Sequence, residues 1–445
     1  MAFILLPILT DSLHPVEFGV KELVALLSSI ILPVAQLGLN NALFRFYIMT
    51  DEDRRGRVLF NAISATALWS FVLFIMMYFL SRPVSSLLLD TAAKPGLIML
   101  GTLVGILDGW FILFTLIYRI EERPISFTFF TCLQTLVTLI GAWILVVKLG
   151  MGVEGVLLAF IIGNLAAIIP VVPGLIRRMD AHLDLPLLGD MLHFGLPFVP
   201  VMLTTIIFTM ADRWLVKELG SFEEAGIYSA GSKLGSLVLL VLTAFRFAWS
   251  PRLYILFKQG VLEKVLPGIY RQLSAVLTIA VAGLTLFSRE FAGIFIADTY
   301  EGVLWIGPII GIAYFFDGFC LLSESGIYVH QRTKVLPVIT LFGAAMNIAL
   351  NVYLIPTHGI EGAAWATVGA YFFLAVLYYR VGNTLLPVKI PWGNLLVDIA
   401  VIAGSFVYAF FIDGLVFRVG AFLALTGLVL LQVGDELRII LGRKQ

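Results

Sequence analysis

Residues 152–178 read GVEGVLLAFIIGNLAAIIPVVPGLIRR, an apolar stretch with one carboxylate near its start and two arginines at its end. An apolar helix of about 20 residues crosses the hydrocarbon core of a bilayer, because each residue adds about 1.5 Å. The stretch therefore predicts a membrane-spanning helix over residues 153–175. Glu154 falls in the first turn of that helix, where a carboxylate complements the helix dipole, so it needs no functional explanation.

Comparable apolar runs follow one another along all 445 residues, and only 13% of the residues are charged. Soluble proteins carry about 25% charged residues. The pattern predicts an all-α, polytopic membrane protein of about fourteen transmembrane helices, with the first one truncated. The predicted helices are 1–10, 18–39, 58–80, 96–118, 125–147, 153–175, 194–216, 226–249, 265–287, 303–326, 335–355, 360–380, 391–412 and 415–434. The short loops between them leave no room for a folded domain outside the membrane.

The basic residues of the loops predict the orientation, because Lys and Arg concentrate in cytoplasmic loops. With the N-terminus inside, cytoplasmic segments hold 18 of the 29 basic residues, and outer segments hold six. We therefore expect a multi-pass protein of the cytoplasmic membrane with both termini in the cytoplasm. The formal net charge is zero, which gives no reason to expect a nucleic-acid partner.

The two halves of the chain share short motifs in the same order, at offsets between 201 and 209 residues. The matching pairs are Glu17-Phe18-Gly19-Val20 with Glu224-Ala225-Gly226-Ile227, Phe44-Arg45-Phe46 with Phe245-Arg246-Phe247, Asp108-Gly109-Trp110 with Asp317-Gly318-Phe319, and Gly152-Val153-Glu154-Gly155 with Gly359-Ile360-Glu361-Gly362. A repeat of six helices, an even number, gives both copies the same orientation. The motifs thus predict a parallel repeat of two six-helix bundles, with a cavity between them.

This repeat sets the predicted domain boundaries. They are an N-terminal six-helix bundle over 1–175, a cytoplasmic linker over 176–193, a C-terminal six-helix bundle over 194–380, and two additional transmembrane helices within 391–434. The counterpart of the helix that begins near Phe194 would start before Met1, so the first helix looks shortened. Half a helix would leave unpaired backbone groups at membrane depth, which favours a misassigned start over a real deletion.

Several of these segments resemble one known family. They are Leu5-Leu6-Pro7-Ile8-Leu9-Thr10, Glu17-Phe18-Gly19, Leu37-Gly38-Leu39, Gly195-Leu196-Pro197-Phe198, Ala211-Asp212-Arg213 and Phe245-Arg246-Phe247-Ala248-Trp249-Ser250-Pro251. The chain resembles, over essentially its whole length, the polysaccharide-biosynthesis or oligosaccharide (O-antigen type) flippases. These belong to the multidrug/oligosaccharidyl-lipid/polysaccharide (MOP) exporter superfamily and have a MATE-like fold. The short first helix departs from the family pattern.

The resemblance implies a transporter and not an enzyme, with no cofactor. The implied substrate is a polyprenyl-pyrophosphate-linked oligosaccharide, moved from the inner to the outer leaflet by alternating access for the synthesis of a polysaccharide such as the O-antigen of lipopolysaccharide. The lipid tail would stay in the bilayer. Other polysaccharide assembly proteins are possible partners.

A pyrophosphate in a cavity of low dielectric constant needs cationic partners, and the guanidinium of Arg offers a two-pronged donor. Arg45 and Arg246 lie at the inner ends of their helices, and Lys233 and Arg271 lie within helices. These four are the candidates for the pyrophosphate and glycan path. The alternative for Arg45 and Arg246, each placed between two Phe, is a snorkelling anchor at the membrane edge.

Asp108 and Asp317 occupy equivalent places in the repeat, near the membrane midplane. Charged groups at that depth are costly, so we consider a site that couples transport to protons or sodium ions. The alternative is bundle packing, since the adjacent Gly109 and Gly318 allow helices to approach closely. Two other charged pairs, Lys21-Glu22 and Asp212-Arg213, are expected to pair with other helices.

Other functions stay open. A cation-coupled exporter of small amphipathic molecules and a lipid II flippase are alternatives within transport, and a scaffolding role is a further one. A membrane glycosyltransferase, polymerase or ligase is disfavoured by the short loops. The sequence has no Walker loop, so we expect no ATP hydrolysis. Cys132 and Cys320 have no nearby Cys or His, which disfavours a disulfide or a zinc site.

Overall fold

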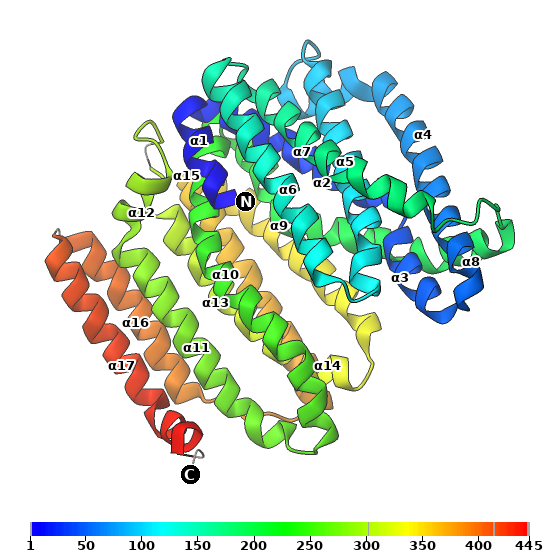
Figure 1. The fold of residues 1–445 in the computed structure, drawn as a ribbon. Helices are drawn as coiled ribbons and strands as arrows, with labels where there is room; N and C mark the ends of the chain where they lie inside the picture. The colour runs from blue at the N-terminus through cyan, green and yellow to red at the C-terminus, as the bar shows by residue number, and fades with distance from the viewer. Residues whose placement is uncertain (1, 301, 413, 443–445) are drawn as a thin grey trace. The chain divides into compact units, whose positions relative to one another are not determined.

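The computed structural model describes residues 2–300, 302–412 and 414–442, and within them the chain is almost entirely helical, with no strand (Figure 1). Eleven helices are long and apolar enough to cross a membrane. One of them, α15 (Leu336–Leu385), contains a non-helical Gly359 and so joins two helices end to end. Counting it twice and adding α1 (Ala2–Ser12) and α17 (Leu415–Gly442) gives 11 + 1 + 2 = 14 helices, the number that the sequence predicts.

The chain forms two compact units, unit 1 over 1–214 and unit 2 over 215–445, and the division falls within α9. Unit 1 contains α1, α2 (Pro15–Gln36), α3 (Leu39–Met49), the 3₁₀ turn η1 (Glu52–Arg54), α4 (Arg55–Leu89), α5 (Pro95–Ile120), α6 (Pro124–Ala142), the π-helical segment η2 (Trp143–Lys148), α7 (Gly152–Ile176), α8 (Leu185–Gly195) and most of α9 (Phe198–Leu219). Unit 2 contains α10 (Phe222–Lys258), α11 (Leu262–Leu286), α12 (Ser288–Phe295), α13 (Ile306–Ser323), α14 (Ser325–Val329), the 3₁₀ turn η3 (Thr333–Val335), α15, α16 (Trp392–Phe411) and α17.

Local sequence explains where many helices begin. Proline occupies the first turn of α2, α5 and α6, where its missing N–H would have no helical partner in any case. The side chains of Asp184 and Ser221 cap α8 and α10 by accepting backbone N–H groups at 3.0 and 3.1 Å. Local sequence thus determines these helix starts, which explains why the predicted starts agree with the structure.

In unit 1, α5 is central and packs against α2, α4 and α7. Small residues bring α2 and α5 together, because Gly105 lies against the backbone of Ser28 and has no room for a Cβ. The hydroxyl of Ser28 donates to the carbonyl of Gly101 at 2.8 Å, and the amide of Gln36 donates to the carbonyl of Gly109 at 2.8 Å. Backbone carbonyls at the contact are therefore satisfied across the two helices.

In unit 2, α13 takes the same place, packed against α10, α11 and α15, and α16 and α17 lie along α11. Gly231 and Gly235 of α10 let Ile306 and Ile310 of α13 approach its backbone. The matched glycines at the repeat also behave alike, since Gly152 has φ +54° and Gly359 has φ +56°. The two halves thus repeat both a packing pattern and a glycine with positive φ.

Several predicted ranges differ from the structure. The helices predicted to end at 80 and 249 continue to Leu89 in α4 and to Lys258 in α10. The predicted helix 18–39 ends at Gln36, and the separate helix α3 follows after left-handed Leu37 and Gly38. A Cβ on Gly38 would overlap the backbone carbonyl of Gly195, so this break belongs to a close contact with α8. The predicted linker 176–193 contains most of α8, which packs on α3 and α4.

Candidate functional site

A charged cluster lies in unit 2, where α10 meets α13. Nη2 of Arg246 is 3.4 Å from Oδ2 of Asp317, and the two side chains are 49% and 17% exposed. Glu324 follows Asp317 by seven residues, two helical turns, and so points to the same side of α13. Glu324 also interacts electrostatically with both Arg246 and Asp317. One guanidinium group is thus shared by two carboxyl groups.

Neighbouring hydrogen bonds fix the helices that carry the cluster. The indole of Trp249 donates to the hydroxyl of Ser325 at 3.3 Å, and the hydroxyls of Tyr270 and Ser323 lie 2.8 Å apart. Other titratable groups that interact with the cluster come from α13, α14 and α15, and they are Cys320, Tyr328, Tyr371 and Tyr378. The guanidinium therefore lies at the rim of a polar region that α10, α13, α14 and α15 build together.

In unit 1, Asp108 belongs to an amide network that joins three helices. Asn164 of α7 donates from Nδ2 to Oδ1 of Asp108 on α5 at 2.8 Å. Gln134 of α6 donates from Nε2 to Oδ1 of Asn164 at 2.7 Å. Asn164 is fully buried, so the network holds α5, α6 and α7 in register. This geometry accounts for Asp108 through packing, and its role in ion coupling stays a prediction.

The remaining predicted site residues lie apart from this cluster. Arg45 on α3 is exposed, and its guanidinium carbon is 4.5 Å from the ring centre of Phe194 on α8, a cation–π contact. Lys233 lies on α10 thirteen residues before Arg246, about 20 Å along the axis. Arg271 is half-buried on α11. Among the predicted site residues of unit 2, Arg246 and Asp317 form an ion pair.

A second set of buried charges ties α9 to α2 within unit 1. Nζ of Lys21 is 2.6 Å from Oε1 of Glu22, and Nε of Arg213 is 3.5 Å from Oε2 of Glu22. The three side chains are between 7% and 14% exposed. The pair of Arg213 with Glu22 joins α9 to α2, as expected, whereas Lys21 pairs with its neighbour Glu22 on the same helix.

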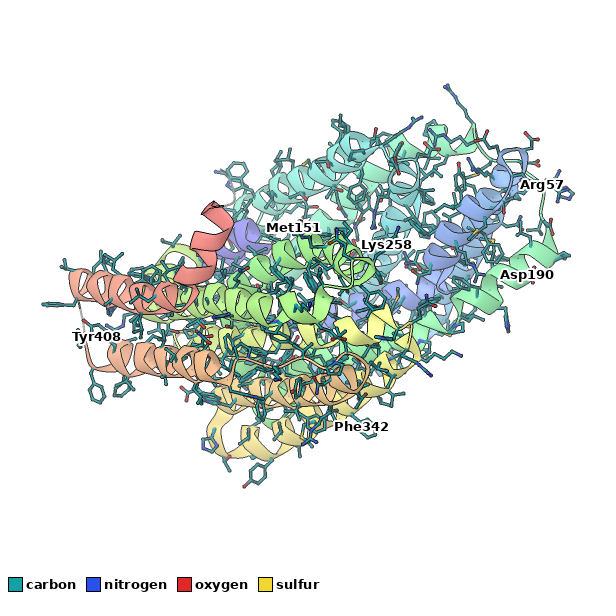
Figure 2. All side chains as sticks on the ribbon, turned by 90° about the horizontal axis from the view of Figure 1, so that it is seen from below. Arg57, Met151, Asp190, Lys258, Phe342 and Tyr408 are labelled. Carbon is teal, nitrogen blue, oxygen red and sulfur yellow. The ribbon has the colours of Figure 1, made fainter. Side chains whose placement is uncertain are left out.

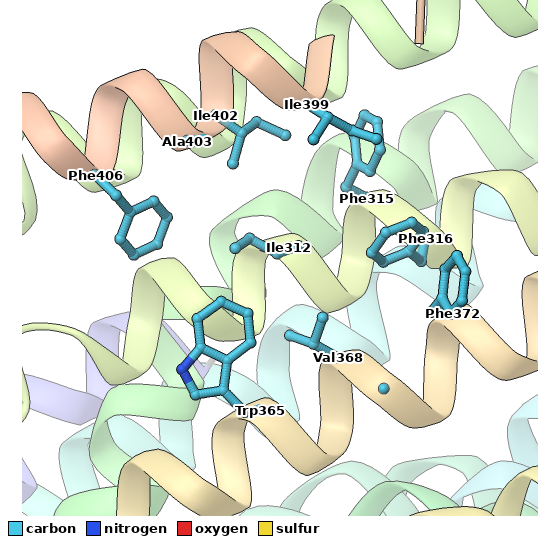
Figure 3. A pocket seen from close by; sticks show the side chains of 11 residues that line it. Ile312, Phe315, Phe316, Trp365, Val368, Phe372, Ile399, Ile402, Ala403 and Phe406 are labelled. Atoms are coloured by element: carbon cyan, nitrogen blue, oxygen red, sulfur yellow. The ribbon is translucent and has the colours of Figure 1, made fainter. Parts of the chain in front are cut away.

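Unit 2 also carries an apolar pocket of about 610 Å³ between α13, α15 and α16 (Figure 3). Its walls are aromatic and aliphatic, formed by Ile312, Phe315, Phe316, Trp365, Val368, Gly369, Phe372, Ile399, Ile402, Ala403 and Phe406. Such a surface suits hydrocarbon. Across the described ranges, no three His, Cys, Asp or Glu side chains are grouped closely enough to hold a metal ion.

Two of these residues, Glu324 and Asn164, are not among the site residues that the sequence predicts. Glu324 has no counterpart among the repeat motifs, and its place at the end of a helix resembles that of a solvated residue. Asn164 carries no charge, so the cost of burying an ionisable group does not single it out. The only available signal was spacing, since Glu324 repeats the helical face of Asp317.

Solved structures with this fold are membrane transporters. The lipid II flippase MurJ in its inward closed conformation is similar, with a TM-score of 0.74 and 16% identity, over 98% of this chain and 96% of that chain. An inward-facing multidrug resistance MATE family transporter of the MOP superfamily has a TM-score of 0.69 and 14% identity, over 86% and 93%. A MOP superfamily transporter from Pyrococcus furiosus Vc1 (DSM3638) has a TM-score of 0.54 and 15% identity, over 83% and 87%.

The protein is thus a multi-pass membrane protein with the fold of the MATE and MurJ transporters. Residues 8–246, more than half of the chain, match the model of the polysaccharide biosynthesis protein family, and the chain belongs to that family. No curated protein sequence matches it. The predicted fold class and family resemblance are both confirmed, and the family and fold together support a membrane flippase or exporter.

Proposed function

We propose that this protein is a flippase that moves a polyprenyl-pyrophosphate-linked oligosaccharide from the inner to the outer leaflet of the cytoplasmic membrane. It would serve polysaccharide biosynthesis, work by alternating access and hydrolyse no nucleotide itself. Membership of the polysaccharide biosynthesis family supports the class of substrate. Both termini would lie in the cytoplasm, and other polysaccharide assembly proteins would be its partners.

The observation that carries the proposal is the Arg246–Asp317 pair. Asp317 engages the guanidinium from one side at 3.4 Å, while the Arg246 side chain remains 49% exposed. A guanidinium has five N–H donors in a planar fork, so the donors left exposed suit the oxygens of a pyrophosphate. Arg45, Lys233 and Arg271 are the further cations that we assign to the path of the pyrophosphate and glycan.

The charge of the cluster favours a coupling role for Asp317. With Asp317 and Glu324 both ionised, their cluster with Arg246 would sum to −1 and would repel an incoming pyrophosphate, so binding of a pyrophosphate requires a neutral carboxyl group. Proton or sodium binding at Asp317 removes that repulsion and links the ion gradient to substrate binding. Asp108 is the second carboxylate that we consider for ion coupling, with bundle packing as its alternative.

The apolar pocket of unit 2 suits the other part of the substrate. A polyprenyl chain is a long branched hydrocarbon, and the walls of the pocket are aromatic and aliphatic. Contact with such a surface leaves no polar group unsatisfied. The proposal therefore keeps the lipid tail in apolar surroundings while the pyrophosphate meets cations.

The test uses the purified full chain in proteoliposomes. A fluorescent polyprenyl-pyrophosphate oligosaccharide would be followed between leaflets by quenching from outside, with and without proton and sodium gradients. We expect Arg246→Ala to reduce the flipping rate about tenfold or more and Arg246→Lys to restore part of it, because Lys keeps the charge without the fork. Arg82→Ala is the matched control, since Arg82 is an exposed arginine of a long helix, α4, outside the cluster.

Two other substrates are tested in the same vesicles. The surplus carboxylate beside Arg246 favours, as a second candidate, a cation-coupled exporter of small amphipathic molecules. Transport of a fluorescent organic cation in the absence of flipping would support that candidate and contradict the flippase. Movement of lipid II in preference to the oligosaccharide lipid would assign the protein to lipid II instead.

A further inference from the structure

Seven basic side chains cluster at one end of unit 2 and are all exposed. We call this surface the basic end of unit 2, and it consists of Arg252, Lys258, Lys264, Arg332, Lys334, Arg380 and Lys389. Glu263 is the one exposed carboxylate among the described residues at this end. None of the seven forms an ion pair within the described part of the chain. The surface therefore carries a charge of about +6 by the count 7 − 1.

Contacts between helices place these residues on one surface. The ring of Phe257, at the end of α10, is 5.6 Å from the ring of His330, just after α14. A small cavity is lined jointly by the start of α11, α14 and the end of α15, through Leu266, Gly326 and Gly382. The α10–α11 turn and α14 lie at the same end of the unit in Figure 1, and Figure 2 labels Lys258 at the end of α10.

The corresponding end of unit 1 has no such excess. Its eight arginines, Arg45, Arg54, Arg55, Arg57, Arg119, Arg123, Arg177 and Arg178, are balanced by eight carboxylates, Asp51, Glu52, Asp53, Glu121, Glu122, Asp180, Asp184 and Asp190. Several are already paired, as Arg57 with Asp180 at 2.6 Å and Arg178 with Glu121 at 2.5 Å. The preference of Lys and Arg for the cytoplasmic side therefore does not by itself explain the basic end of unit 2.

Exposed apolar side chains alternate with the basic ones on the same turns. Tyr254, Ile255 and Phe257 are between 40% and 53% exposed on the turns that carry Arg252 and Lys258. A surface that pairs large apolar groups with cations fits the boundary between acyl chains and headgroups. It does not fit a soluble anion or a nucleic acid, which would need no apolar contact.

We propose that the basic end of unit 2 binds the headgroups of anionic phospholipids, such as phosphatidylglycerol. The apolar side chains enter the acyl region, and the seven cations bind the phosphates without displacing any intramolecular ion pair. Each Lys or Arg near an anionic bilayer strengthens association about fivefold, and the effect weakens with salt. Unit 1 has little selectivity for the same lipids, because its charges cancel.

The test measures lipid retention by the full chain in detergent, by native mass spectrometry, with equal amounts of phosphatidylglycerol and phosphatidylcholine. We expect preferential retention of phosphatidylglycerol, reduced about tenfold or more in the triple variant Lys258→Gln, Lys264→Gln, Lys334→Gln. The matched control is Arg54→Gln, Arg119→Gln, Arg177→Gln, three exposed basic residues of unit 1. Retention in the control should stay within about twofold of the unmodified chain, as charge balance at unit 1 implies.

Three outcomes overturn the proposal. Equal retention of the two lipids by the unmodified chain removes the selectivity, and equal losses in both triple variants show a general charge effect. If a water-soluble, short-chain polyprenyl pyrophosphate displaces phosphatidylglycerol one for one, the surface belongs to the transport substrate instead. The measurement needs no transport, so its failure is distinct from failure of the proposed flippase activity.

Discussion

Asn164→Ala tests whether the amide network of unit 1 holds the bundle together. The substitution removes the bond that Asn164 donates to Asp108 at 2.8 Å and the bond that it accepts from Gln134 at 2.7 Å. Hydrogen bonds between membrane helices contribute about 0.6 kcal/mol on average and up to about 1.7 kcal/mol. The two losses, with the half-buried amide of Gln134 left unsatisfied, sum to about 2–3 kcal/mol.

A thermal unfolding assay in detergent, followed by circular dichroism, reports this loss. For a unit of about 200 residues, 1 kcal/mol corresponds to a Tm change of about 2–4 °C, so we expect a fall of about 5–10 °C. Asp108→Asn keeps an oxygen that can accept the same bond, and we expect it to change Tm by less than about 3 °C.

Asn351→Ala is the matched control. Asn351 is also fully buried, but it bonds only to Asn347 on its own helix, at 2.9 and 3.1 Å, and its own oxygen has no partner among the described residues. Its removal breaks no contact between helices, so we expect a small change in Tm. Equal Tm changes for Asn164→Ala and Asn351→Ala would refute the argument, because the loss would then reflect only the removal of a buried amide.

Other predictions concern backbone strain and buried charge. Gly359→Ala and Gly152→Ala should each lower the free energy of unfolding by about 1 kcal/mol, because both glycines have a positive φ. Both sites have room for a Cβ, so the loss would come from the backbone conformation alone. Unchanged Tm values would contradict these backbone conformations. Glu22→Gln should cost about 3 kcal/mol, since it weakens a buried pair with Arg213. Glu52→Gln is the control, since this carboxylate is 86% exposed in a surface pair, and it should change the free energy of unfolding by less than about 0.5 kcal/mol. A similar loss in Glu22→Gln and Glu52→Gln would contradict the stabilising role of the buried ion pair.

Agreement between sequence and structure is best where the information is local. The predicted helix 125–147 corresponds to α6 with η2 (124–148), and the predicted helix 391–412 corresponds to α16 (Trp392–Phe411). Apolar length, proline at helix starts and charges at helix ends all act within a few residues. The repeated motifs also place Gly152 and Gly359 at matching positions, and the structure gives both glycines a positive φ.

The break between α2 and α3 shows where local information ends. Polar residues interrupt the apolar run around Gly38, namely Gln36, Asn40 and Asn41, and glycine is a residue that commonly ends a helix. What the local pattern does not show is the close approach of Gly195, more than 150 residues away in sequence, which leaves no room for a Cβ at Gly38. A contact of that kind depends on how α8 packs, and no local pattern encodes it.

Asp108 and Asp317 show most clearly which properties the sequence determines and which depend on the tertiary structure. The sequence alone determined that both carboxyl groups lie at equivalent depths of two repeated helices, because depth follows from the length of the apolar run. Only the tertiary structure decided their partners, Asn164 in unit 1 and Arg246 in unit 2. The residue 207 positions after Asn164 is Tyr371, which has no amide to offer, whereas α10 brings an arginine to Asp317. A helix fixes the position of a side chain along its own axis, but the neighbours that pack against it determine what that side chain binds.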